Sequence, residues 1–305
     1  MIPTGAPLAL LMHGQLVAEP DQPFFGKMGV GLLRYSDNPI VAVLDESHAG
    51  GDVVDALRAG LSIVNGLHVV LNDDRSLVEL LHPGAFMWDV RREPPGLMPG
   101  TGAAAALDVR RVLTVGTDMA IGKMTASIEL DRAARARGLR SAFLASGQIG
   151  MCISGDGIPL DAVRVDFAAG AVEQLVLRRA TGNDVLWVEG QGSILHPAST
   201  AWLPLVRGSC PTHLVLVHRA GQRRVARLPV DMPSLREVVG LFEAVASVAG
   251  TVPGPRVVGI ALNCGHLDDD AATAAVRAVE QETGLPTADV VRSGAGRLLD
   301  AVLAT

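Results

Sequence analysis

The chain has 305 residues, 49% of them hydrophobic, and a formal net charge of −6. This length allows one large or two modest domains with enough apolar material for a core. The acidic balance and the lack of a long basic run argue against nucleic-acid binding. We find no run of about 18 apolar residues that would predict a membrane span. The first residues lack the basic start of a signal peptide, so we expect a cytoplasmic protein without a membrane partner.

The cysteines support a reducing compartment. Cys152, Cys210 and Cys264 are scattered and show no metal-ligand spacing, which argues against structural zinc and against a disulfide framework. We interpret them as buried small residues. A catalytic thiol is the alternative.

The first third of the chain predicts a small α/β unit. A strand at 40–44 precedes a short helix within 48–60, a strand within 61–67, a helix over 73–81 and a strand over 87–91. Residues 92–102 are rich in Pro and Gly and are interpreted as a linker. We therefore predict a Rossmann-like domain over 1–98 and a second domain over 99–305.

The second domain predicts a doubly wound parallel sheet of the α/β class, because short apolar runs alternate with helical patterns. Asp268 is the expected N-cap of its fourth helix, and Gly284 with Pro286 is the expected stop. Strands are expected near 111–116, 140–145, 185–189, 213–218, 256–262 and 288–291, and helices near 123–137, 161–181, 233–249, 268–283 and 294–303.

A glycine-bounded loop lies between the first strand and the first helix of this domain. Residues 116–125 read GTDMAIGKMT, with one residue more between the glycines than the common phosphate-binding loop has. Such a loop turns backbone N–H groups toward a phosphate, and the helix start adds partial positive charge. The predicted phosphate-site residues are Gly116, Thr117, Asp118, Gly122, Lys123, Met124 and Thr125.

Lysine use supports this site. Lys27 and Lys123 are the only lysines, so 26 basic residues minus these two leaves 24 arginines. A compact ammonium suits a phosphate cradle, whereas a planar guanidinium does not fit it. A glycine-capped helix with a chance lysine is the alternative.

Ligands of open parallel sheets bind outside the carboxyl ends of the strands, and polar residues gather at two of these ends. Ser146, Gln148 and Asp156 lie in a glycine-rich stretch that we interpret as a substrate-contacting loop or as a plain surface loop. Glu189 ends the strand near 185–189, where a carboxylate can accept a proton or bind magnesium together with Thr125.

Further polar residues follow the later strands. Gln191, Ser193 and His196 come after Glu189, and His196 is either a base, an anion contact or a loop cap. Arg219 and Arg223 can bind a carboxylate or a second phosphate, or simply face solvent. Asn263 ends the strand near 256–262, where its amide could read a purine edge.

These motifs carry two resemblances. GTDMAIGKMTAS and VEGQGS resemble the loops of dethiobiotin synthetase, which implies phosphate contacts at residues 116–123 and a magnesium contact at Glu189. That family has a threonine where this chain has Met124, so Thr125 would have to supply the hydroxyl ligand. This resemblance implies an ATP- and Mg-dependent ligase or kinase that acts on a small carboxylate.

The second resemblance covers most of the chain. GKMT, SGQIG, SGDGIPLDAV, VEGQGSILHPA and VVGIALN, with NGLHVVLNDD and WDVR, are similar to a bacterial P-loop family that includes D-glutamate N-acetyltransferases. Between Leu57 and Leu61 the chain lacks a strand-and-helix portion of that family, so we expect a shortened Rossmann-like domain. A homo-oligomer is expected, because such a domain has too few elements to cover both faces of its sheet.

The second resemblance implies an N-acyltransferase. The phosphate loop would hold the diphosphate of acetyl-CoA, and Glu189 or His196 would take a proton from the amine of a small acidic amino acid, the D form included. Met124 favours this interpretation, because phosphoryl transfer also needs a well-held magnesium. The ATP-dependent ligase remains the alternative, and a regulatory module that binds nucleotide without catalysis is a third class.

Overall fold

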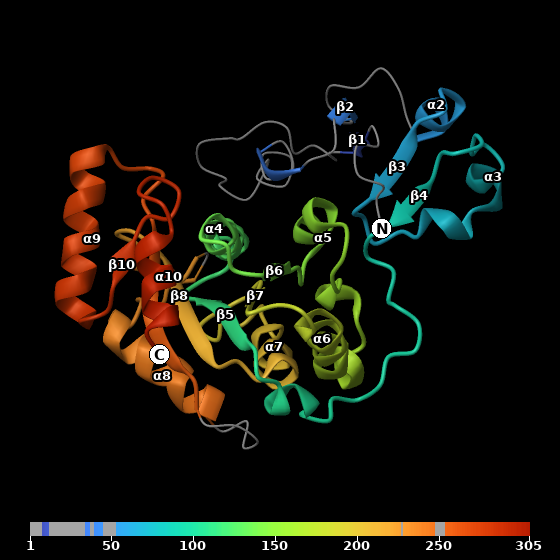
Figure 1. The fold of residues 1–305 in the computed structure, drawn as a ribbon. Helices are drawn as coiled ribbons and strands as arrows, with labels where there is room; N and C mark the ends of the chain where they lie inside the picture. The colour runs from blue at the N-terminus through green and yellow to red at the C-terminus, as the bar shows by residue number, and fades with distance from the viewer. Residues whose placement is uncertain (1–7, 12–33, 37–39, 45–52, 227, 248–253) are drawn as a thin grey trace. The chain divides into compact units, whose positions relative to one another are not determined.

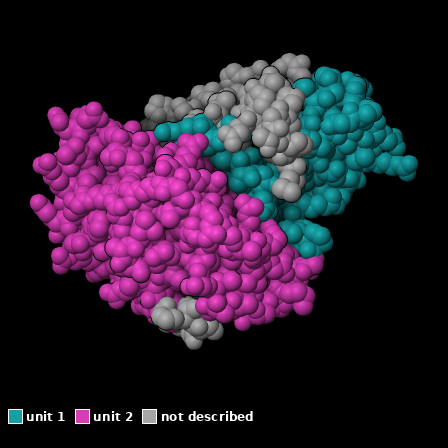
Figure 2. Space-filling model, in the orientation of Figure 1, with its two compact units in different colours: residues 1–95, 147–163 teal, residues 96–146, 164–305 magenta. Residues whose placement is uncertain are grey.

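The computed structural model describes residues 8–11, 34–36, 40–44, 53–226, 228–247 and 254–305. Internal contacts divide the chain into two compact units (Figure 2). Unit 1 comprises residues 1–95 and 147–163, and unit 2 comprises residues 96–146 and 164–305. No helix of these described stretches is long and apolar enough to cross a bilayer.

Unit 1 is built on a parallel sheet of short strands with helices between them (Figure 1). Its elements before residue 95 are β1 (Leu8–Leu11), β2 (Ile40–Leu44), α2 (Val53–Arg58), β3 (Ser62–Asn65), a 3₁₀ turn (Leu71–Asp73), α3 (Arg75–Val78) and β4 (Met87–Asp89). The described strands lie in the order β2-β1-β3-β4, and Leu57 and Ile63 are buried in the core. The predicted Rossmann-like character is confirmed. β1 was not predicted, and α3 is shorter than expected.

A buried carboxylate joins the ends of β3 and β4. Asp89 accepts hydrogen bonds from the Asn65 amide (2.6 Å) and from the backbone N–H groups of Leu71 and Asn72 (2.9 and 3.0 Å). Burial raises the pKa of Asp89, but these hydrogen bonds outweigh it and the net shift is downward. The NGLHVVLNDD and WDVR segments are thus two sides of one polar contact.

The segment 147–163 forms a helix where the sequence analysis placed a polar loop. Helix α5 (Gln148–Ser154) buries Met151 and Cys152 and ends at Gly155, whose φ is 72°. Its glycines and serines suggested a loop, and burial of the apolar side chains overrides that preference. The sequence analysis assigned this segment to the second domain, whereas its contacts place it in unit 1.

Arg91 fixes this segment within unit 1. Its guanidinium forms an ion pair with Asp161 (3.2 Å) and donates from Nε to the side-chain oxygen of Gln148 (3.2 Å), whose amide is assigned in the orientation that allows this bond. A planar guanidinium can bind both groups at once.

Unit 2 is a doubly wound domain, as predicted. Its strands are all parallel and lie in the order β10-β9-β8-β5-β7-β6. They are β5 (Arg110–Gly116), β6 (Ser141–Leu144), β7 (Val185–Val188), β8 (His213–Arg219), β9 (Arg256–Asn263) and β10 (Thr287–Ala288). The helices are α4 (Lys123–Ala136), α6 (Val165–Ala180), α7 (Trp202–Ser209), α8 (Leu235–Ser247), α9 (Asp269–Thr283) and α10 (Gly296–Leu303), and a 3₁₀ turn covers Ala103–Ala106.

Helices lie on both faces of this sheet (Figure 1). Helices α4 and α10 share one face, and α6, α7 and α8 lie on the other. The core beneath α4 and α10 includes Trp187, whose indole N–H donates to Ser141 at 2.9 Å. Ser141 in turn donates to Asp131 at 2.6 Å, so the polar atoms in this core are hydrogen-bonded.

The element predictions for unit 2 hold with three corrections. Helix α7 was not predicted, because Pro204 and Gly208 lower helix propensity, yet Pro204 lies in the first turn, where proline is tolerated. A Cβ at Gly208 would lie 2.2 Å from the carbonyl oxygen of Ala169, so glycine allows α7 to approach α6 closely. Helix α6 starts four residues late, at Val165 rather than 161. Strand β10 is confined to Thr287–Ala288.

Candidate functional site

The phosphate loop is the turn between β5 and α4. Gly122 is the N-cap of α4 and has a φ of 110°, a conformation that favours glycine. Ala120 also has a positive φ, 58°. The loop thus delivers the chain to the start of a 14-residue helix, whose first N–H groups are available to an anion.

Lys123 is buried rather than exposed. Its side chain is 6% exposed, and its ammonium donates to the carbonyl oxygen of Asp118 at 2.7 Å. A Cβ at Gly116 would lie 3.0 Å from Lys123 Nζ, and a Cβ at Gly190 would lie 3.0 Å from Lys123 Cδ. The lysine therefore occupies a channel that two glycines keep open. Its ammonium contacts the phosphate loop, to which the sequence analysis assigned it.

Thr117 and Asp118 both point into the protein, and each is fully buried. Thr117 Oγ1 shares a hydrogen bond with His218 Nδ1 at 2.9 Å, and its N–H donates to Val217 O at 3.2 Å. Burial lowers the pKa of His218 to about 4, so this imidazole is neutral near neutral pH. The side chains of both residues bind other parts of the protein, and so does the N–H of Thr117.

The Asp118 carboxylate is saturated with donors. Oδ1 accepts from the N–H of Met119 at 2.7 Å. Oδ2 accepts from Gln222 Nε2 at 2.5 Å and from the N–H of Ala226 at 2.6 Å. Three donors spread the negative charge that would otherwise oppose a phosphate in the same loop.

Glu189 stands at the end of β7 beside the phosphate loop, as predicted. It is 7% exposed, and its Oε2 accepts from the backbone N–H of Ser146 at 2.9 Å. Ser146 Oγ donates to the Glu189 carbonyl at 2.7 Å. Two adjacent strand ends, those of β6 and β7, thereby hold this carboxylate in one place.

The residues that follow Glu189 form a tight turn. The Gln191 amide donates to Ser146 O, Ser193 Oγ accepts from Leu195 N at 3.1 Å, and both residues lie in unit 2 with Glu189. His196 Nδ1 accepts from Ala198 N at 3.1 Å, so Nε2 carries the hydrogen that it donates to Ala226 O at 3.2 Å. Both ring nitrogens of His196 bind backbone, which favours the loop-cap interpretation over a base.

Asn263 binds the phosphate loop. Its Nδ2 donates to Ile121 O at 3.0 Å, and its Oδ1 accepts from Gly265 N at 3.1 Å. The amide predicted to read a purine thus has both of its polar atoms in protein hydrogen bonds.

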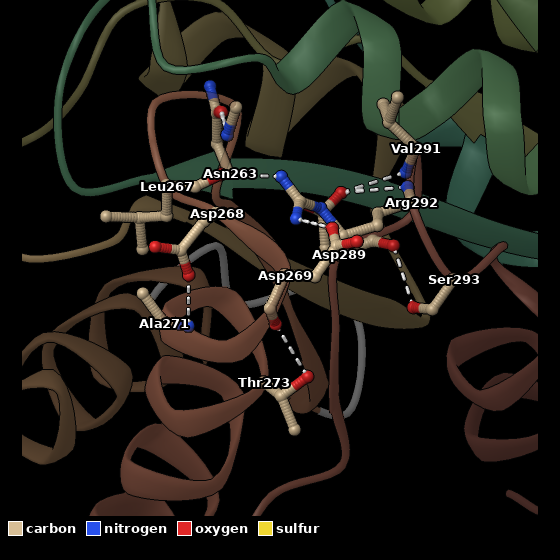
Figure 3. A network of polar contacts seen from close by, with 11 residues as sticks. Asn263, Leu267, Asp268, Asp269, Ala271, Thr273, Asp289, Val291, Arg292 and Ser293 are labelled. Atoms are coloured by element: carbon tan, nitrogen blue, oxygen red, sulfur yellow. Dashed lines mark hydrogen bonds and ion pairs between the residues drawn. The ribbon is translucent and has the colours of Figure 1, made fainter.

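The loops after β9 and β10 are tied to each other near Asn263 (Figure 3). Arg292 pairs with Asp269, donates to Leu267 O at 2.8 Å and lies 3.8 Å from Asp289 Oδ2. Asp268 caps α9 by accepting from Ala271 N at 2.8 Å, and Gly284 ends that helix with a φ of 73°; both predictions are confirmed.

Two predicted substrate residues belong to unit 1. Gln148 contacts Arg91, and Asp156 Oδ1 accepts from Gly157 N at 2.8 Å. Unit 2 holds Ser146, Gln191, Ser193, Arg219 and Arg223. Arg219 is half-buried at the end of β8, and Arg223 is exposed.

Two residues at the start of α4 bear on metal binding. The side chains of Met124 and Thr125 are both partly exposed, and the sequence position at which a hydroxyl ligand was looked for holds the thioether of Met124. Among the described residues, no cluster of three or more His, Cys, Asp or Glu side chains could hold a metal ion. Glu189 and Thr125 are the oxygen donors that would be available to magnesium.

The three cysteines lie in the interior. Cys152, Cys210 and Cys264 form no disulfide, and each is buried. Burial raises the pKa of Cys152 to about 12 and that of Cys264 to about 11, so these thiols stay protonated near neutral pH.

Sequence reasoning missed two residues that shape the site. Thr114 Oγ1 accepts from Gly190 N at 2.9 Å and shares a hydrogen bond with Ser127 at 3.0 Å, which ties β5, α4 and the residue after Glu189 together. His218 supports Thr117. A threonine within an otherwise apolar strand was the available signal for the first, and a histidine at a strand end was the signal for the second.

Together these features define the class of the protein. A phosphate loop between β5 and α4 of a doubly wound parallel sheet marks a P-loop α/β protein, here with a Rossmann-like unit before it. More particularly, the chain belongs to the DUF1611 family. Residues 98–299 match the P-loop domain of that family and residues 39–93 match its Rossmann-like domain, each described as a domain of unknown function.

Three relatives are informative. A crystal structure of a DUF1611 family protein from Anabaena variabilis is 48% identical, has a TM-score of 0.91 and covers 98% of this chain and 100% of its own. A protein from Tritonibacter scottomollicae named D-glutamate N-acetyltransferase is 38% identical over 83% of this chain and 75% of its own length. A protein of the same name from Pseudoalteromonas is 33% identical over 79% of this chain and 72% of its own length.

Proposed function

We propose that this protein is an N-acetyltransferase that moves an acetyl group from acetyl-CoA to the amine of a small acidic amino acid, with D-glutamate as the first substrate to test. The observation that carries the proposal is the 38% identity over 83% of the chain to a protein named D-glutamate N-acetyltransferase. A second relative of that name, 33% identical, supports it.

The phosphate loop is the proposed anchor for the donor. Backbone N–H groups at the start of α4 and the ammonium of Lys123 are suited to the diphosphate of a CoA thioester. Holding a diphosphate requires no change in its bonds, so the missing hydroxyl at Met124 does not impair this role.

Glu189 is the proposed base. The neutral amine nitrogen attacks the thioester carbonyl and gives up one proton to the carboxylate, the carbon–sulfur bond breaks, and the carboxylate returns that proton to the departing sulfur, so that CoA leaves as the thiol. Ser146 and the turn after β7 hold Glu189, and both nitrogens of His196 bind backbone, so Glu189 suits this role better than His196. Arg219 and Arg223 are the proposed contacts for the substrate carboxylate.

The test is direct. The purified protein is incubated with acetyl-CoA and single D- or L-amino acids, and free thiol is measured. Thiol release that depends on an acidic amino acid, and that Lys123→Met lowers at subsaturating acetyl-CoA, is the expected result. Formation of ADP from ATP and the same amino acids, without thiol release, would replace the proposal with the ligase. Ligand binding with no turnover on any amino acid would indicate a regulatory module.

A further inference from the structure

One residue of the phosphate loop holds a neighbouring loop that is rich in arginine. We call residues 219–226 the arginine loop, because Arg219, Arg223 and Arg224 lie in it. Asp118 is fully buried, and its Oδ2 accepts from Gln222 Nε2 (2.5 Å) and from Ala226 N (2.6 Å) of this loop. These are charge-assisted hydrogen bonds, the stronger kind in proteins.

Both backbone polar groups of Ala226 are bound by side chains from the two strand-end motifs. Its N–H donates to Asp118, from the phosphate loop, and its carbonyl accepts from His196, from the turn after β7. At the other end of the arginine loop, Ala220 N donates to Asn263 O at 3.0 Å, and the preceding His218 contacts Thr117. The loop is therefore fixed at both ends to the phosphate loop and its neighbours.

The bonds to Asp118 and Arg224 hold the amide of Gln222 in one orientation. Gln222 Nε2 faces two acceptors, Asp118 Oδ2 and Arg224 O (2.9 Å), so the amide cannot be reversed. Its Oε1 is buried and has no hydrogen-bond partner among the residues that the structure describes. Burying an acceptor without a hydrogen bond costs free energy. The two hydrogen bonds that Gln222 Nε2 donates must therefore contribute more than this cost.

Asp118 also contacts the phosphate-binding cation. Its carbonyl oxygen accepts from Lys123 Nζ at 2.7 Å, while its carboxylate holds the arginine loop. The carbonyl of Asp118 thus contacts Lys123, the proposed phosphate contact. Its carboxylate contacts the arginine loop, which is proposed to bind the carboxylate of the acceptor. A phosphate bound in the loop would be a second acceptor for the ammonium that now donates to Asp118.

We propose that Asp118 is a positioning residue that couples anion binding at the phosphate loop to the placement of the arginine loop. The coupling rests on the proposed function of the phosphate loop. It means that the donor diphosphate, once bound, sets the position of the arginines for an acidic acceptor, so that donor and acceptor affinities depend on one another.

The experiment uses inorganic pyrophosphate as the probe of the phosphate loop. Binding is measured by calorimetry, and hydrogen exchange is followed in peptides that cover residues 219–226, with and without pyrophosphate. The variants are Asp118→Asn, which turns a donor toward Gln222 and Ala226, and Gln222→Met, which removes the amide. Asp131→Asn is the matched control, because Asp131 is another buried carboxylate that accepts from a serine away from this site.

In the wild type and in Asp131→Asn, pyrophosphate should change exchange in 219–226 by about tenfold, which is within the usual range of coupling between sites. In both variants pyrophosphate should still bind through Lys123. Exchange in 219–226 should no longer respond to it in Asp118→Asn, and the response should be weaker in Gln222→Met, which keeps the bond between Asp118 and Ala226. A purely structural role would speed exchange in these variants without weakening the response. If Asp118→Asn does not fold, Gln222→Met decides the matter.

Two results would overturn the coupling alone: pyrophosphate that binds without changing exchange in 219–226, or an unchanged response in Gln222→Met. Failure of the wild type to bind pyrophosphate would instead reject the phosphate loop as an anion site, and the coupling with it. The two failures are therefore distinguishable.

Discussion

The hydroxyl oxygen of Thr114 accepts the backbone N–H of Gly190 at 2.9 Å, and this contact joins the strand before the phosphate loop to the residue after Glu189. No side chain fits at Gly190, because a Cβ there would lie 1.7 Å from the carbonyl oxygen of Thr114. The close approach of these two backbones places the carboxylate of Glu189 beside the phosphate loop.

Gly190→Ala should therefore lower the free energy of unfolding by at least about 2 kcal/mol, because the backbone of β5 would have to move. Urea unfolding at neutral pH measures this change. Gly240→Ala is the control: a Cβ at Gly240, in helix α8, would meet nothing within 4 Å. That variant should gain up to about 1 kcal/mol. Equal stability of the two variants would mean that the packing at Gly190 is looser than described.

Lys123→Met keeps the apolar stem of the lysine and removes its charge. We expect pyrophosphate and acetyl-CoA affinity to fall roughly 10- to 100-fold, since hydrogen bonds to charged groups contribute about 1.5–3 kcal/mol. Lys123→Arg should fail as well, because the glycine channel at Gly116 and Gly190 has no room for a guanidinium. Calorimetric titration of both variants is the measurement, and full affinity in the arginine variant would show the lysine to be incidental.

Glu189→Gln should lower turnover by about 10²- to 10⁴-fold, the usual contribution of a general base. Affinity for acetyl-CoA should change little, because the new amide oxygen can still accept from Ser146 N. Separate kcat and KM values decide between a base and a residue that shapes the pocket. Equal losses in both would favour the pocket role, and an effect seen only with added magnesium would favour a metal role.

The buried His218 predicts a loss of stability in acid. Its pKa in the folded protein is about 4, lowered by burial from an ordinary value of 6.5. Because this pKa is lower in the folded than in the unfolded protein, its contribution to the free energy of unfolding is fully present above pH 6.5. The contribution is lost as the pH falls toward 4. Between pH 7 and pH 4 this loss amounts to about 3 kcal/mol.

His218→Gln keeps a hydrogen-bonding group next to Thr117 and removes the titration. The difference in unfolding free energy between pH 7 and pH 4.5 should therefore be smaller in this variant than in the wild type. Urea unfolding at the two pH values measures it. An identical difference in both proteins would mean that the imidazole is protonated without penalty where it lies.

The sequence by itself determined the phosphate loop, the strands and helices that flank it, and the carboxylate at the end of β7. These follow from local patterns: apolar runs, glycines at a helix start and an acidic residue after a buried strand. The similarity of the sequence to a known family then suggested the reaction that we propose.

Only the tertiary structure decided what each polar side chain of these loops does. Asp118, His196 and Asn263 were candidates for ligand contacts, and their atoms turn out to bind the protein's own backbone. Helix α5 formed in a glycine-rich stretch, and Met151 and Cys152 on it are buried. A hydrogen bond between residues more than one hundred positions apart, such as that of Asp118 with Ala226, leaves no local pattern. It exists because parallel strands bring distant loops to the same edge of a sheet.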